Sequence, residues 1–162
     1  MNRLPILAGC GLSALAGFGL ALAYPSLDRE RTTLTRLAPD ETVRARLVDR
    51  KGREGYRTFE IRLESLHDGK TTTLYHSPDE GTPHGTERLI WSRDGTMLLL
   101  VGRHFFVKDD LFLDNGDQLY FLHHRPSGRS WSNAAEETGL PRLQAEQVRG
   151  VEFTEPIILK GG

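Results

Sequence analysis

The chain has 162 residues and a formal net charge of −1, from 21 basic and 22 acidic side chains. A chain of this length folds as one domain with a sizeable core. Its content of 38% hydrophobic and 27% charged residues excludes a disordered chain. The balanced charge excludes the broad basic face that nucleic-acid binding needs, so we expect no nucleic-acid partner.

The N-terminal segment has the organisation of an export signal. Arg3 precedes an uncharged run, residues 4–23, which ends in Ala21-Leu22-Ala23. A positive start, an apolar run and small residues at the cleavage positions are the pattern of a secretory signal peptide. We therefore expect residues 1–23 to direct the chain out of the cytosol, and cleavage after Ala23 would release it to the periplasm or the exterior.

The same segment supports two other interpretations. As a helix, residues 4–23 would span about 30 Å, enough to cross a bilayer as an uncleaved anchor with Arg3 inside. Leu7-Ala8-Gly9-Cys10 also resembles the lipobox of bacterial lipoproteins, which implies lipidation of Cys10, although here the apolar region before the cysteine is short. Because Cys10 is the only cysteine, the body of the chain can hold no disulfide, zinc–thiolate site or cysteine nucleophile.

Residues 24–42 are polar and show no hydrophobic period, so we expect a linker there and one β-rich domain over residues 43–162. Apolar and charged side chains alternate in residues 43–47 and 59–63. This period of two predicts strands with one face in water.

Asp68-Gly69 predicts a two-residue hairpin turn, since both central positions of such a turn favour a positive φ. Folding the chain there places Leu63 opposite Leu74 and Ile61 opposite His76.

Residues 89–91 and 97–101 predict two further strands, joined by a turn at Arg93-Asp94-Gly95. The second strand consists of consecutive apolar residues, which indicates burial on both faces. We expect this pair to be the centre of the sheet, with Trp91 in the core.

Asn115-Gly116 predicts another hairpin, between residues 111–113 and 119–122. Asn133 is then expected to cap a short helix with Glu136 as its capping-box partner. A second helical segment is expected from Pro141 to Val148, followed by short strands at residues 151–153 and 157–159. The fold class is therefore mainly β, a small antiparallel sheet domain with one or two short C-terminal helices.

Trp91-Ser92-Arg93-Asp94-Gly95, followed by an apolar strand, resembles the repeat of TolB-like β-propellers, with Arg93 in place of the repeat's proline. The resemblance covers about one blade. A closed propeller needs at least four blades of about 40 residues, so the resemblance implies a blade-like sheet and no full propeller. That family's role as a periplasmic platform for protein contacts implies a binding module.

Histidine and aspartate residues around 104–124 raise a metal hypothesis. If the Asn115-Gly116 hairpin extends far enough, Lys108 faces His123, and Asp110 and Asp109 become diagonal neighbours of His123 and His124. A carboxylate beside an imidazole could start a metal site, together with His104. Successive residues of a strand point to opposite faces, however, so His123 and His124 cannot share one ion without a bulge.

Other chemistry-bearing residues have structural explanations. Ser92 and Ser132 lie outside any nucleophile motif and read as residues of a turn and of a helix cap. Asp114-Asn115-Gly116-Asp117 lacks the spacing of a calcium loop. We therefore assign no catalytic, metal or cofactor residue. The preferred hypothesis is an exported or membrane-tethered, non-enzymatic β-domain that contacts another envelope protein or has a structural role, and the alternative is a metal-dependent enzyme or binder.

Overall fold

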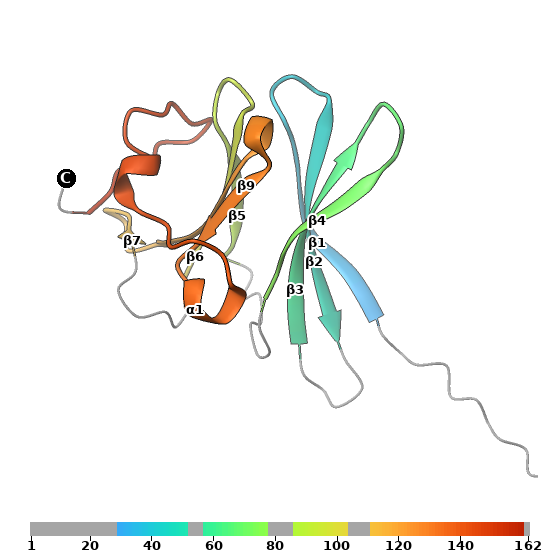
Figure 1. Ribbon diagram of the computed structural model, residues 1–162, viewed down its shortest axis with the longest axis horizontal. Helices are drawn as coiled ribbons and strands as arrows, with labels where there is room; N and C mark the ends of the chain where they lie inside the picture. Colours follow the sequence, from blue (N-terminus) through green and yellow to red (C-terminus); the bar gives the residue numbers. More distant parts are fainter. Residues whose placement is uncertain (1–28, 52–56, 78–85, 104–110, 161–162) are drawn as a thin grey trace, which may run out of the picture.

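The computed structural model describes residues 29–51, 57–77, 86–103 and 111–160 (Figure 1). The expected signal or anchor, residues 1–23, lies outside these ranges. None of the helices within them is long and apolar enough to cross a membrane.

The described chain is mainly antiparallel β-structure, as the sequence predicted. The strands are β1 (Arg29–Leu37), β2 (Val43–Lys51), β3 (Arg57–Ser65), β4 (Thr71–His76), β5 (Arg88–Trp91), β6 (Met97–Gly102), β7 (Leu111–Phe112), β8 (Gln118–His124) and β9 (Arg129–Ser132). Three short helices follow β8: η1 (Arg125–Ser127), α1 (Ala135–Thr138) and η2 (Ala145–Gln147).

The strands form two sheets where one was expected. Sheet A is a simple meander in the order β1-β2-β3-β4. Sheet B has the order β5-β6-β8, and β7 and β9 pair with successive parts of the remaining edge of β8. The sheets pack against each other as two layers, and the C-terminal segment lies on the far side of sheet B (Figure 1).

Sheet B is buried on both faces. Its first face meets sheet A in a core that contains Leu47, Phe59, Ile61, Tyr75, Leu89, Trp91, Leu98, Leu100 and Phe121. Its second face packs against the C-terminal segment through Ile90, Leu99, Val101, Leu113, Leu119, Leu122, Leu143, Val148 and Phe153. The consecutive residues 98–101 thus alternate between two cores, which confirms burial on both faces, and Trp91 is in the core as expected.

The expected linker over residues 24–42 contains a strand. Residues 29–37 form β1, which pairs along its length with β2. Leu34 faces the core, whereas the neighbouring side chains are exposed. A single inward apolar residue gives no hydrophobic period, and this is why the sequence pattern did not reveal the strand.

β3 and β4 form the expected hairpin in a different register. Ile61 lies opposite Tyr75 rather than His76. The register shifts at the next position, which leaves Leu74 as a bulge that does not face Leu63 as expected. The expected two-residue turn at Asp68-Gly69 is wrong, because the Ser65 amide donates to the Lys70 carbonyl and residues 66–69 form a longer loop. The longer loop changes the register at the turn, and the unpaired residue of the bulge then moves it back by one position.

The Asn115-Gly116 hairpin is also displaced by one residue. The Leu113 amide donates to the Asp117 carbonyl at 2.8 Å, so Asp114 does not face Asp117. Residues 114–116 form the loop, with Gly116 at φ 81°. This is a three-residue hairpin loop that ends on a left-handed glycine, instead of a two-residue turn.

The C-terminal region has less regular structure than expected. Asn133 does not cap α1, because its side-chain amide donates to the Leu119 carbonyl instead. The segment from Pro141 to Val148 contains only the single turn η2. The expected last strands are reduced to two isolated bridges, Ser92–Phe153 and Leu113–Leu159, which fix the segment to sheet B.

Candidate functional site

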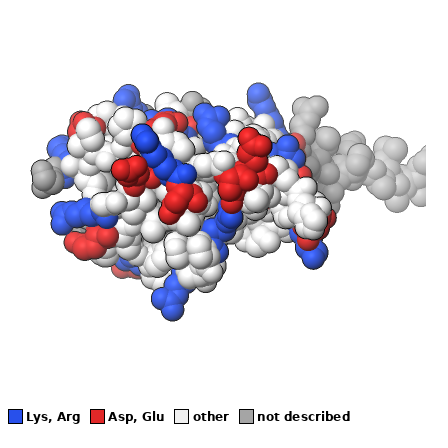
Figure 2. Space-filling view, turned by 90° about the horizontal axis from the view of Figure 1, so that it is seen from above, with Lys and Arg blue, Asp and Glu red and all other residues white. Residues whose placement is uncertain are grey.

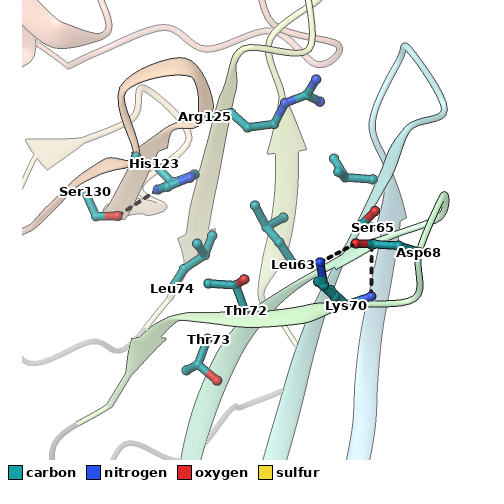
Figure 3. Close-up of a pocket in the computed structure, with 12 residues that line it drawn as sticks. Leu63, Ser65, Asp68, Lys70, Thr72, Thr73, Leu74, His123, Arg125 and Ser130 are labelled. Carbon is teal, nitrogen blue, oxygen red and sulfur yellow. Dashed lines mark hydrogen bonds and ion pairs between the residues drawn. The ribbon is translucent and has the colours of Figure 1, made fainter.

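A cleft of about 530 Å³ lies between the two sheets, at the end of the molecule where the β3–β4 loop and η1 meet (Figure 3). Sheet A contributes one wall through β2, β3 and β4, and sheet B contributes the other through β8, η1 and β9. The volume falls within the range of about 300–1,000 Å³ that ligand pockets occupy. The cleft is therefore the candidate binding site of the described chain.

The wall from sheet A includes part of β4, the edge strand of that sheet. Three consecutive residues, Thr72, Thr73 and Leu74, line the cleft. Thr72 lies opposite Leu63, which also lines the cleft, so the cleft lies over the inner face of sheet A at this end of β4. Among the described strands β4 pairs only with β3, so its other edge has no strand partner.

The tip of the β3–β4 hairpin places a carboxylate and an ammonium group at the mouth of the cleft. Asp68 Oδ2 lies 3.0 Å from Lys70 Nζ, and Asp68 Oδ1 accepts a hydrogen bond from the Lys70 amide. Hydrogen bonds from Ser65 and then Lys70 lower the pKa of the Asp68 carboxyl. Asp68 is therefore ionised but held by its own hairpin, while the Lys70 side chain is 83% exposed.

His123 forms part of the opposite wall, where it points into the cleft beside Ser130 (Figure 3). Its Nδ1 lies 2.8 Å from Ser130 Oγ, and the residue is only 5% exposed. Burial, and then the neighbouring His124, lower the pKa of His123 to about 4. The imidazole is therefore neutral at pH 7.

Arg125 joins the two sheets beside the cleft. Its guanidinium donates to both carboxylate oxygens of Asp40 in the β1–β2 turn, at 2.6 and 3.3 Å. This contact holds the pKa of the Asp40 carboxyl well below its usual range. Arg129, between the lining residues Gly128 and Ser130, is exposed, and its side chain has no hydrogen bond or ion pair among the described residues.

Basic and acidic side chains are interspersed on the loop end of the molecule (Figure 2). No single-sign patch covers the described part of this face, so charge selectivity can arise only locally, from the residues around the cleft.

The structure brings together only part of the expected metal group. His104, Asp109 and Asp110 lie outside the described residues. His123 pairs with Ser130 of β9, and Lys108, its expected partner, also lies outside the described residues. His124 does not line the cleft, and its Nδ1 lies 2.7 Å from Ser127 Oγ. Within the described ranges, no three His, Cys, Asp or Glu residues are grouped so that they could hold a metal ion.

The other candidates have structural contacts. Ser92 Oγ accepts from the Met97 amide and donates to Asp94, which stabilises the turn between β5 and β6. Ser132 Oγ accepts from the Ala134 amide just before α1. Both serines are fully buried. Asp117 is bound by Arg88 and Arg103, at 2.9 and 2.7 Å, so its carboxylate ties together the start of β5, the end of β6 and β8.

The edge of β4 and the role of Ser130 were missed by sequence reasoning. The run Thr71-Thr72-Thr73 favours a strand, but only its pairing on one side reveals it as an edge. Comparisons with family models, with curated proteins and with solved structures found no match for this chain. The propeller resemblance of Trp91-Ser92-Arg93-Asp94-Gly95 therefore stays a prediction.

Proposed function

We propose that this chain is an exported or membrane-tethered, non-enzymatic β-domain that contacts another protein of the cell envelope through the cleft between sheets A and B. The observation that carries the proposal is a cleft between the sheets that is lined in part by β4, a strand that pairs only with β3 among the described strands. A strand edge offers a row of backbone donors and acceptors, which is the part of a sheet that pairs with other polypeptides.

The chemistry of the cleft supports binding over catalysis. Ser130 and His123 are spaced like a nucleophile and its base. However, a pKa of about 4 makes His123 a weak base at neutral pH, and no carboxylate among the described residues hydrogen-bonds its ring. Asp68, the carboxylate of the cleft, is bound by Lys70. The polar groups of the site are thus satisfied by each other rather than poised for reaction.

The position of the cleft also favours a protein partner. β1 begins at Arg29, opposite Lys51, whereas Val43 and Ser65 of the cleft pair at the other end of β2 and β3. A strand of nine residues separates these ends by about 26 Å. The start of β1 therefore lies at the opposite end of sheet A from the cleft residues, and in an anchored chain the cleft would be directed away from the membrane.

Two measurements in cells test this proposal. Residues 1–40 fused to a reporter that is active only outside the cytosol should give a signal if the chain is exported. A photo-crosslinking amino acid at Thr72, which lies opposite Leu63 and lines the cleft, should yield one distinct adduct with another protein. The same group at Thr35, exposed on the outer face of sheet A, is the matched control and should yield none. Equal labelling at both positions, or none at Thr72, would argue against the cleft as a contact site.

A further inference from the structure

The two walls of the cleft have different chemistry, and this difference specifies what kind of group the partner places there. We infer that the cleft takes an uncharged aromatic side chain with a hydrogen-bonding group, a tyrosine or a tryptophan of the partner protein. The ring lies on the wall from sheet A, and its O–H or N–H group meets the wall from sheet B. The inference rests on the proposed function of the cleft as a protein-contact site, and it adds the chemistry of the group that enters.

The wall from sheet A provides an apolar surface. Val43, Leu63 and Leu74 line the cleft, and all three pack in or against the core between the sheets. Leu63 is buried, whereas Val43 and Leu74 are only half-buried and have apolar area left to cover. Removing apolar area from water is the main favourable contribution to most protein association, so this wall favours an apolar group.

The wall from sheet B presents hydrogen-bonding side chains instead. On β8, Phe121 still belongs to the core between the sheets, whereas His123, two residues further on, lines the cleft together with Ser130. The His123 ring points into the cleft, and its Nδ1 is held at Ser130 Oγ (Figure 3). Its second nitrogen, Nε2, lies on the side of the ring away from Ser130, where it can accept or donate one further hydrogen bond.

The charged groups of the cleft already have counter-charges. Lys70 and Asp68 form an ion pair at 3.0 Å, and Arg125 and Asp40 form another at 2.6 Å. His123 is uncharged at neutral pH, because burial lowers its pKa to about 4. A charged side chain of the partner would lose its hydration in the cleft without gaining a free counter-charge, which is costly. The cleft therefore favours an uncharged group.

A ring with a polar group matches both walls at once. An aliphatic side chain or phenylalanine would leave His123 without a new hydrogen bond, and a small polar side chain would leave Val43 and Leu74 uncovered. Tyrosine and tryptophan combine a large apolar face with one O–H or N–H group, and they are enriched in the centres of protein interfaces. The cleft volume of about 530 Å³ suits one such ring with the residues next to it.

Four small molecules built on the same ring test this chemistry. The probe p-cresol is the tyrosine side chain, toluene lacks the hydroxyl, and 4-methylbenzoate and 4-methylbenzylamine carry a negative and a positive charge. Titrated into the isotope-labelled full chain, p-cresol should bind about fivefold or more tightly than each of the others. NMR signals of Leu74 and Ser130 should shift, and that of Thr35 on the outer face should not.

The affinity of p-cresol should also be the same at low salt and in about 1 M NaCl, because no net charge is involved. Equal affinities for p-cresol and toluene, tighter binding of a charged probe, or no binding of p-cresol at several millimolar would overturn the inference.

A matched pair of variants locates the binding in the cleft. Thr72→Trp adds an indole ring within the cleft and should abolish binding of p-cresol, because it occupies the place of the partner's ring. Thr35→Trp is the control, since Thr35 is also an exposed threonine of sheet A but lies on the outer face, and it should leave the affinity unchanged. Equal effects of the two variants would mean that the probe binds elsewhere.

Two substitutions of His123 test the polar wall. His123→Phe removes the hydrogen-bonding group and should reduce the affinity for p-cresol to that for toluene. His123→Gln retains a hydrogen-bonding group and should keep the preference for p-cresol. If both variants keep the preference, or both lose it, the assigned contact is wrong. The four probes and the Thr72 pair decide the inference even where His123→Phe does not fold.

The outcomes separate this inference from the proposed function. A crosslinked protein at Thr72 in cells, without a preference for p-cresol, would preserve the cleft as a contact site and remove only the aromatic side chain. A preference for p-cresol without any crosslinked protein would assign the cleft to a free aromatic molecule, and it would overturn the proposed function and the partner's side chain together.

Discussion

Sheets A and B are built from similar antiparallel strands, yet they occupy different environments. In β3 of sheet A, Phe59, Ile61 and Leu63 are buried between the sheets, and Glu60, Arg62 and Glu64 lie on the other face. In β6 of sheet B, four consecutive residues are fully buried. Sheet A has one core, whereas sheet B lies between two, because the C-terminal segment covers its second face.

The outer face of sheet A is held together by ion pairs rather than by packing. Glu30 contacts Arg50 and Arg62, and Glu60 contacts the same two arginines. Ion pairs that remain partly in water contribute little to stability, whereas buried leucines contribute several kcal/mol each. Two sheets of equal regularity can therefore depend on one or on both of their faces.

The largest expected loss of stability comes from truncating buried residues, and it differs between neighbouring residues of each sheet. In sheet B, Leu99→Ala and Leu100→Ala should each lower the free energy of unfolding by about 2–5 kcal/mol, because each side chain fills one of the two cores. In sheet A, Leu47→Ala should cost a similar amount, but Arg46→Ala should cost far less because Arg46 is partly in water. Urea unfolding of the four variants measures this pattern.

If Leu99→Ala were mild while Leu100→Ala were severe, the C-terminal segment would not form a true second core, and sheet B would resemble sheet A.

The next effect is the dependence of the free energy of unfolding on pH that His123 of sheet B causes. His123 has a pKa of about 4 in the folded protein and about 6.5 in an unfolded chain. The unfolded chain therefore binds the proton more readily between these values, so stability is highest above pH 6.5 and falls as the pH decreases toward 4. Between about pH 7 and pH 5 this amounts to about 2 kcal/mol.

His123→Gln is the control for the pH effect. Unfolding of this variant should depend much less on pH over the same interval, because the residue can no longer take up a proton. An unchanged pH dependence would mean that another group is responsible and that His123 is not desolvated by the cleft wall.

A smaller effect is expected where a turn of sheet B meets sheet A. Gly95 has φ 71°, and a β-carbon there would lie 3.6 Å from the Pro39 ring, an ordinary contact. Gly95→Ala should therefore cost about 1–2 kcal/mol from the left-handed backbone alone. Gly116→Ala, at φ 81° with nothing within 4 Å, should cost the same. A larger loss at Gly95 in thermal unfolding would show that the β1–β2 turn is packed tightly against it.

The sequence predicted those strands whose side chains follow a clear period or a continuous apolar run. β2, β3 and β6 were found in this way. β1 was missed because Leu34 is its one inward apolar residue among exposed neighbours. Both hairpins were found from their glycines, but both loops are longer than expected and β4 contains a bulge, so the registers differ. These features depend on contacts along the whole strand and not on the turn itself.

The cleft could not be predicted for a related reason. Leu74 and His123 come from different sheets, and only the packing of those sheets brings them to one site. Each residue alone reads as an ordinary member of a strand. The sequence could place them on their strands but could not show that β4 and β9 end up facing the same space.

The smallest expected effect on stability comes from removing a partly exposed charge of sheet A, that of Glu30. Hydrogen bonds from Arg62 and Arg50 lower the pKa of Glu30 in sheet A to about 2. Its side chain is 40% exposed, however, so solvent screening reduces the contribution of these contacts. Glu30→Gln should cost about 0.5 kcal/mol at low salt and almost nothing in about 1 M NaCl, where charges are screened within about 3 Å.

Asp117 of sheet B provides the comparison for Glu30. Burial raises the pKa of Asp117. Hydrogen bonds from Arg103 and Asn115 and the charge of Arg88 lower this pKa by a larger amount, so the net shift is downward. Because its side chain is only 10% exposed, Asp117→Asn should cost about 1–3 kcal/mol, and salt should change this little. Urea unfolding of Glu30→Gln and Asp117→Asn at low and at high salt measures the salt sensitivity of each contribution. Equal salt sensitivity at the two positions would mean that the outer face of sheet A is shielded from water, in conflict with its alternating sequence.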